Sequence, residues 1–129
     1  MYARENRGKS WHNFKKALIS DFKDVQGGTT SEGIHLGAMA GTISLIQQCY
    51  TGMRFKEKSL YLRPRLPENL KKIKFRLRYL QHWIEIHLTP EQLQIKNNGK
   101  KHDRISIFVD ATQFIFTPGE EKIIHYKEL

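Results

Sequence analysis

The chain has 129 residues, enough for one domain, and its 39% hydrophobic and 27% charged residues are typical of a soluble globular protein. A net charge of +9 would suit a nucleic-acid partner, but the lysines and arginines are scattered and no nucleic-acid-binding motif is present, so we predict none. No apolar run is long enough to cross a membrane, the N-terminus lacks the apolar core of a signal peptide, and the single cysteine, Cys49, excludes an internal disulfide, which together predict a cytoplasmic protein without membrane contact.

The first predicted element is an amphipathic helix over residues 11–25. Its apolar side chains recur at steps of three and four, as one buried helix face requires: Trp11, Phe14, Leu18, Phe22 and Val25. Ser10 is the predicted N-cap. The segment 26–33, rich in glycine, threonine and serine, cannot continue the helix and is predicted to be a loop.

A second helix is predicted from Ile34 to about Tyr50, and it is apolar around most of its circumference. The apolar residues are Ile34, Leu36, Ala38, Met39, Ala40, Ile43, Leu45 and Ile46. Such a helix must be covered on several sides, which one companion helix cannot do. We favour cover by further helices outside this sequence; the alternative is cover by the β-rich part of the same chain. Without that cover, the apolar face predicts self-association into a homo-oligomer.

After Gly52 the hydrophobic period changes from helical to alternating. Residues 53–55 and 60–62 flank a turn and predict a hairpin, and residues 73–79 alternate between apolar and basic side chains, as in a strand with one wet face. Further strands are predicted, separated by turn signals, at 83–88, 93–95, 105–109, 114–116 and 123–126. This spacing favours an antiparallel β-sandwich over residues 53–129.

Several polar and aromatic residues of the predicted strands suggest structural roles. His82 and His87 stand at odd spacing on opposite faces, so they cannot share a metal ion, and we predict no metal site. Tyr79 and Trp83 would suit a sugar-stacking platform, but aromatic strand residues more commonly belong to the core. The basic face is interpreted as a solvated strand surface: Lys72, Lys74, Arg76 and Arg78.

The loop before the second helix carries the most informative chemistry. Glycines and hydroxyl groups at a helix start present N–H and O–H donors to an anion, phosphate above all. The candidate phosphate-binding residues are Thr29, Thr30, Ser31 and His35. Glu32 would repel phosphate, and it suits a sugar contact or a base that acts on water. The alternative is a purely structural capped helix with Thr30 or Ser31 as N-cap.

The same segment resembles glycoside hydrolase family 65, which includes maltose, trehalose and kojibiose phosphorylases and related α-glucoside hydrolases. The resemblance rests on FKDVQGGTTSEGIHLGAMAGT at residues 22–42 and continues, in order, through YTGM at 50–53, PRLP at 64–67 and FRLRY at 75–79. The resemblance covers roughly residues 10 to 90. It is specific, because the sixteen consecutive residues 26–41 fit the family.

The resemblance implies that residues 1–52 are the last helices of an (α/α)6 catalytic barrel and that residues 53–129 are its C-terminal β-sandwich. It implies an inverting phosphorolysis of an α-linked glucose disaccharide to β-glucose 1-phosphate, with inorganic phosphate as co-substrate and no cofactor. The phosphate-side residues would be Thr29, Thr30, Ser31 and His35. No segment here matches the one that carries the general acid, so we expect the chain alone to be inactive. The alternatives are a hydrolase and a non-catalytic carbohydrate-binding or structural module.

Overall fold

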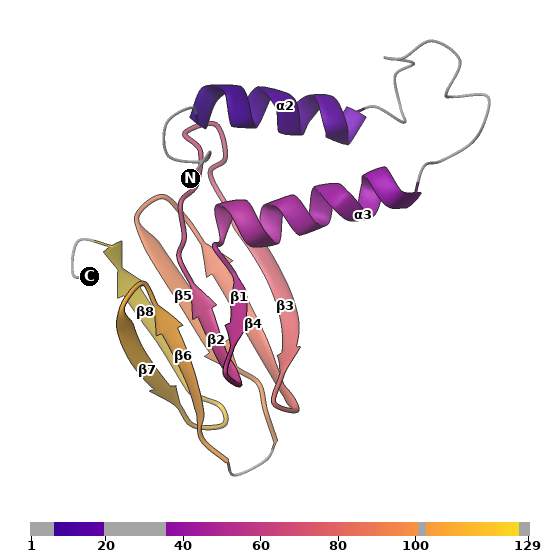
Figure 1. Ribbon diagram of the computed structural model, residues 1–129. Coiled ribbons are helices and arrows are strands. Elements are labelled where there is room, and N and C mark those ends of the chain that lie inside the picture. The colour runs from indigo at the N-terminus through magenta and orange to yellow at the C-terminus, as the bar shows by residue number, and fades with distance from the viewer. Residues whose placement is uncertain (1–6, 20–35, 101–102, 127–129) are drawn as a thin grey trace. The chain divides into compact units, whose positions relative to one another are not determined.

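The computed structural model describes residues 7–19, 36–100 and 103–126. The chain divides into two compact units, Met1–Cys49 and Tyr50–Leu129. The described residues of the first unit are helical, and those of the second form two β-sheets (Figure 1). Over the described residues, no helix combines the length and apolar character that crossing a membrane requires.

Both predicted helices are present. Helix α2 spans Arg7–Ile19, and helix α3 spans Leu36–Leu45 and continues as a short π-helix, η2, over Ile46–Tyr50. The prediction of Ser10 as N-cap is wrong, because the helix already begins at Arg7. The predicted extension of the first helix over 20–25 lies outside the described residues.

Part of α3 is open to solvent. The side chains of Ile43 and Leu45 are 59% and 44% exposed. At Gly37 and Gly41 an added Cβ would meet nothing within 4 Å. This part of the apolar helix therefore has little cover from the described residues.

The described residues of the second unit form eight strands in two four-stranded sheets that lie face to face (Figure 1). The first sheet has the order β1-β2-β6-β7, with β1 Arg54–Lys56, β2 Ser59–Leu62, β6 Ile105–Val109 and β7 Thr112–Phe116. The second has the order β3-β4-β5-β8, with β3 Ile73–Tyr79, β4 His82–Leu88, β5 Gln92–Asn97 and β8 Glu121–His125. The predicted β-sandwich is confirmed. Its strand pairs are antiparallel except β2–β6, which is parallel.

The core lies between the two sheets and follows the period-two alternation of each strand. The fully buried apolar side chains are almost all branched aliphatic residues: Leu60, Leu62, Ile84, Ile86, Leu88, Leu93, Ile95, Ile105, Ile107, Val109 and Phe116. Tyr79 ties the sheets together, since its hydroxyl lies 2.8 Å from the carbonyl oxygen of Lys58 and 3.1 Å from that of Ser106. Burial raises the pKa of this hydroxyl.

Two hairpins turn through a pair of non-glycine residues with positive φ. The β1–β2 turn uses Glu57 and Lys58, and the β3–β4 turn uses Leu80 and Gln81, all with positive φ. Positive φ at both central residues is typical of the tight turn whose twist matches antiparallel strands. The first turn was predicted. The second follows from the strand register, in which Tyr79 faces His82.

Candidate functional site

The predicted phosphate-side residues Thr29, Thr30, Ser31 and His35, together with Glu32, lie outside the described residues. Their roles stay predictions, and the geometry below concerns the β-sandwich.

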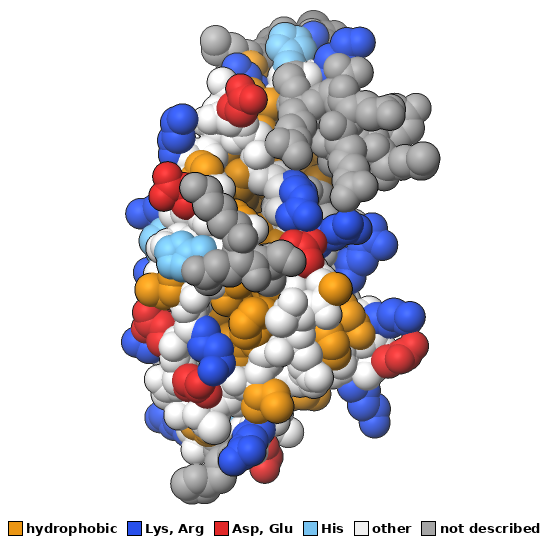
Figure 2. All heavy atoms as spheres, turned by 90° about the vertical axis from the view of Figure 1, so that its left-hand side faces the viewer, with side chains coloured by type: hydrophobic (Ala, Val, Ile, Leu, Met, Phe, Trp, Pro, Cys, Tyr) orange, Lys and Arg blue, Asp and Glu red, His pale blue; other side chains and the backbone are white. Residues whose placement is uncertain are grey.

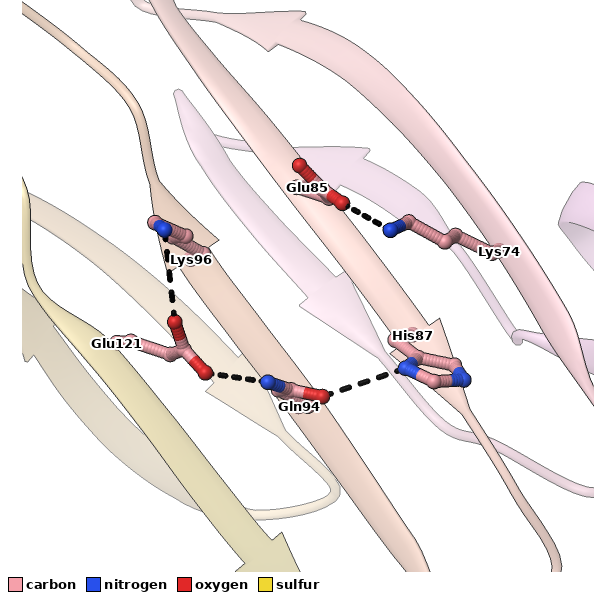
Figure 3. A pocket seen from close by; sticks show the side chains of 6 residues that line it. All are labelled: Lys74, Glu85, His87, Gln94, Lys96 and Glu121. Atoms are coloured by element: carbon pink, nitrogen blue, oxygen red, sulfur yellow. Dashed lines mark hydrogen bonds and ion pairs between the residues drawn. The ribbon is translucent and has the colours of Figure 1, made fainter.

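A polar pocket of about 180 Å³ opens on the outer face of the second sheet (Figure 3). The strand register assembles it. Lys74 of β3 faces His87 of β4, which faces Gln94 of β5, and one row along, Glu85 faces Lys96, which faces Glu121 of β8. The six lining residues are Lys74, Glu85, His87, Gln94, Lys96 and Glu121. Charged and amide groups of four strands thus converge on one small surface.

The hydrogen bonds along the pocket have a definite direction. Gln94 Nε2 donates to the carboxylate of Glu121, so Gln94 Oε1 faces His87. His87 Nδ1 therefore carries a hydrogen and donates to that oxygen across 3.2 Å. The other ring nitrogen of His87, Nε2, is buried and has no hydrogen-bond partner in the part of the chain that the structure describes. In the neutral ring this nitrogen is an unsatisfied acceptor.

The pocket is electrically balanced. Lys74 Nζ lies 2.5 Å from the carboxylate of Glu85, and Lys96 Nζ lies 3.7 Å from that of Glu121. The hydrogen bond from Lys74 is the main reason why the pKa of Glu85 lies below its ordinary value. Two cations and two anions leave no formal net charge from these four groups.

The side of the molecule drawn in Figure 2 has the same mixed character. Lys and Arg side chains are interspersed there with Asp and Glu.

The aromatic residues Tyr79 and Trp83 lie on opposite faces of the second sheet, and so do the two histidines His82 and His87. Tyr79 and His82 are buried between the sheets, whereas Trp83 is 52% exposed on the outer face, which His87 shares. The prediction that the histidines occupy opposite faces is confirmed. Tyr79 is a core residue as expected, but the assignment of Trp83 to the core is wrong, and the two aromatic rings cannot form one platform.

A buried polar network lies beneath this sheet. Asn97, fully buried, presents its Oδ1 to His82 Nδ1 at 3.1 Å and to Gly99 N at 2.9 Å, and its Nδ2 donates to the carbonyl oxygen of Thr117. The run Asn97-Asn98-Gly99 is a turn signal in the sequence, but Asn97 is the last residue of β5. Its amide satisfies groups from two separate loops, which explains why a polar residue is tolerated there.

A second cluster lies at the PRLP segment. Arg65 donates two hydrogen bonds to the two carboxylate oxygens of Asp110, at 3.2 and 3.3 Å, and Arg63 Nε lies 3.2 Å from the same carboxylate. Asp110 lies between β6 and β7, so the cluster links segments distant in sequence. The forked geometry of arginine suits this pairing.

Sequence reasoning did not find the pocket as a unit. It assigned Lys74 to a solvated face and His87 to a structural role, and it did not single out Gln94, Lys96 or Glu121. Strand alternation placed the side chains on one face, but only the register brings them together.

Comparisons with known proteins indicate the family to which the chain is related. The model of the glycosyl hydrolase family 65 C-terminal domain matches residues 53–115. An uncharacterized glycosyl hydrolase of Mycobacterium tuberculosis is 45% identical over 87 residues, covering 67% of this chain and 7% of that protein. Trehalose 6-phosphate phosphorylase of Lactococcus lactis is 38% identical over 77 residues, covering 60% of this chain and 10% of that protein.

A solved structure shows the same fold. It is a candidate kojibiose phosphorylase from the human microbiome, with a TM-score of 0.76 and 21% sequence identity, covering 87% of this chain and 14% of that one. The chain thus spans a small fraction of the length of the proteins it matches. The matched segment, the relatives and the β-sandwich agree, and the chain belongs to glycosyl hydrolase family 65, matching its C-terminal part.

Proposed function

We propose that this chain is the C-terminal part of an inverting α-glucoside phosphorylase that converts an α-linked glucose disaccharide and inorganic phosphate to β-glucose 1-phosphate. The observation that carries the proposal is the sequence similarity to a relative named trehalose 6-phosphate phosphorylase. Three further relatives, two α,α-trehalose phosphorylases and a kojibiose phosphorylase, point the same way.

In this proposal residues 1–52 supply the final helices of the catalytic barrel. Thr29, Thr30, Ser31 and His35 hold the attacking phosphate at the start of the second helix, where backbone N–H groups and the helix dipole favour an anion. The general acid comes from a segment that this sequence does not match. Loss of a general acid lowers rates by about 10²- to 10⁴-fold, so we propose that turnover needs that segment.

The test joins this chain to a family 65 barrel segment that carries the general acid. Trehalose, kojibiose and maltose are supplied with and without phosphate, and β-glucose 1-phosphate is measured. Thr30→Ala and His35→Ala should raise the KM for phosphate at least about 10-fold, which corresponds to about 1.4 kcal/mol of binding. Matched controls are Thr112→Ala and His125→Ala, exposed residues of β7 and β8.

The outcomes separate the alternatives. Sugar phosphate formed only with phosphate, and lost in the loop variants but not in the controls, supports a phosphorylase. Release of free glucose without phosphate, with Glu32→Gln as the damaging change, would instead favour the hydrolase. Equal KM values in the loop and control variants would remove the proposed phosphate contacts.

We further propose that the isolated chain self-associates through α3, because Ile43 and Leu45 leave apolar surface in water. Light scattering should show oligomers that Ile43→Glu disperses. A monodisperse monomer of the unaltered chain would contradict this proposal.

A further inference from the structure

The outer face of the second sheet carries an exposed aromatic ring beside the polar pocket. Trp83, Glu85 and His87 alternate along β4 and share this face, so Trp83 precedes the pocket by one repeat of about 6.8 Å. Asn98 connects them, since its N–H donates to the carbonyl oxygen of Trp83 at 2.8 Å and its side chain to Glu85 at 3.4 Å. The ring and the pocket therefore form one continuous surface.

We infer that this surface, defined as Trp83 together with the pocket of Glu85, His87, Gln94 and Glu121, binds a neutral saccharide. A pyranose ring would stack on the half-exposed indole of Trp83. The next sugar along β4 would lie over the pocket, where its hydroxyls meet both acceptors and donors (Figure 3). This inference does not depend on the phosphorylase proposal, which concerns other residues.

Charge balance selects the class of ligand. In the pocket, Lys74 and Lys96 are each paired with a carboxylate, so an anionic ligand there would have to break an ion pair and approach Glu85 or Glu121. Arg76 and Arg78 lie beside this surface, opposite Glu85 and Trp83, and the phosphate control tests whether they attract an anion instead. A hydroxyl group both donates and accepts, so it can join the existing hydrogen bonds without displacing a charge. The six lining residues contain acceptors on both glutamates and donors on both lysines and Gln94.

His87 offers an additional reason for a hydroxylated ligand. Its Nδ1 is occupied by Gln94, and its Nε2 is an acceptor without a partner among the described residues. This nitrogen is buried, so a ligand hydroxyl would donate to it only after a turn of the ring that gives up the hydrogen bond to Gln94. Stacking on Trp83 alone would favour any ligand with a flat apolar face. The polar pocket adds the requirement that the ligand also carries hydroxyl groups.

The affinity should be weak. The pocket is small, about 180 Å³, and its polar groups already bond to one another, so a sugar gains little beyond stacking and a few exchanged hydrogen bonds. We expect a Kd on the order of 1–10 mM for a disaccharide.

The experiment is an amide chemical-shift titration of the full 15.2 kDa chain, a size well suited to it. Trehalose, maltose and kojibiose are added up to about 50 mM, several times the expected Kd. Sorbitol, which has hydroxyls but no ring face, and inorganic phosphate serve as control ligands. Saturable shifts should map to β4, β5 and Asn98 with the disaccharides and not with either control.

Variants then test each part of the surface. Trp83→Ala should weaken binding at least about 10-fold, consistent with stacking energies of about 1–3 kcal/mol seen for flat rings on aromatic side chains. Gln94→Leu should weaken it several-fold, because both its donor and its acceptor are removed. The matched control is Phe55→Ala, an aromatic residue that is 59% exposed on β1 of the other sheet and should bind normally.

Several results would overturn the inference. These are no saturable shift in the unaltered chain, shifts that map away from β4 and β5, equal binding by sorbitol or phosphate, and equal loss in Phe55→Ala and Trp83→Ala. The unaltered chain alone decides the first three, so they do not depend on the folding of any variant. Thermal unfolding of each variant verifies the fold for the fourth.

Discussion

Replacing Gly52 by alanine should destabilise the unit Tyr50–Leu129 strongly, although only one methyl group is added. Gly52 has φ +62°, and a Cβ there would lie 2.5 Å from the carbonyl oxygen of Arg63 and 2.7 Å from its Cβ. The backbone of Arg63 cannot easily retreat, because its N–H donates to Thr51 O at 2.9 Å and Arg65 N–H donates to Tyr50 O at 2.8 Å.

Two costs add at this position. A left-handed conformation costs an L-residue about 1–2 kcal/mol, and forcing an extra carbon into a packed site costs about 1–3 kcal/mol. We therefore expect a loss of about 2–5 kcal/mol. For a unit of this size each kcal/mol lowers Tm by about 4–8 °C. Gly119→Ala is the matched control, since Gly119 has φ +82° but nothing within 4 Å of an added Cβ, so it should lose only the first cost.

The assay is urea unfolding followed by tryptophan fluorescence. The chain has two tryptophans, so Trp11→Phe leaves Trp83 as a single reporter within the β-sandwich unit. The steric reasoning is refuted if Gly52→Ala and Gly119→Ala differ by less than about 0.5 kcal/mol, within the usual scatter of independent sites.

Three further changes probe the same unit. Gly99→Ala should cost about 2–4 kcal/mol in urea unfolding, because its Cβ would overlap the buried ring of His82; a loss below about 0.5 kcal/mol would argue against this packing. A double-mutant cycle of Arg65→Ala and Asp110→Ala should give a coupling of up to about 1 kcal/mol, as both are partly exposed, and no coupling would show that the ion pair adds nothing to stability. Burial raises the pKa of Tyr126 to about 12, so the folded state keeps its proton longer than the unfolded state, and stability from this group is lost as pH rises from about 10 to about 12. Tyr126→Phe should be neutral or stabilising near pH 7, because the hydroxyl is buried without a hydrogen-bond partner among the described residues, and should show a shallower loss of stability above pH 10; identical pH slopes would contradict this account.

Much of the β-sandwich could be predicted because its strands alternate so regularly. Along β3, apolar residues alternate with basic ones. The apolar residues at the two ends of the strand, Ile73 and Tyr79, are buried as expected. Turns that contain glycine or proline can also be predicted from the sequence. The Leu80–Gln81 turn carries no such signal, and only the pairing of its flanking strands forces positive φ on two residues that disfavour it.

Asn97 shows a second kind of limit. Asparagine followed by Asn98 and Gly99 is a strong local turn signal. The side-chain oxygen of Asn97 does accept the N–H of Gly99, two residues on, but the same side chain also contacts His82 of the neighbouring strand and donates to Thr117, and Asn97 stays within β5. A partner 15 residues away cannot be inferred from local composition.

The pocket was beyond sequence reasoning for a related reason. Lys74, His87 and Gln94 form one row across three strands, and a slip of one residue in either pairing would send part of the row into the core. Register depends on turn lengths and on which face is buried, and both had to be known at once. Trp83 was misassigned because an aromatic strand residue is usually buried, whereas its neighbours Ile84 and His82 occupy the inner face.

The two binding proposals rest on opposite electrostatics, which makes them separable in one molecule. The loop at Thr29–Ser31 with His35 is proposed to attract an anion through unpaired donors and a helix start. The pocket beside Trp83 has both of its lysines paired and no net charge among its four ionic groups, so it should respond to neutral sugars rather than to phosphate. Raising the salt concentration should therefore weaken phosphate binding while leaving saccharide binding nearly unchanged, because screening acts on net charge and not on stacking or exchanged hydrogen bonds.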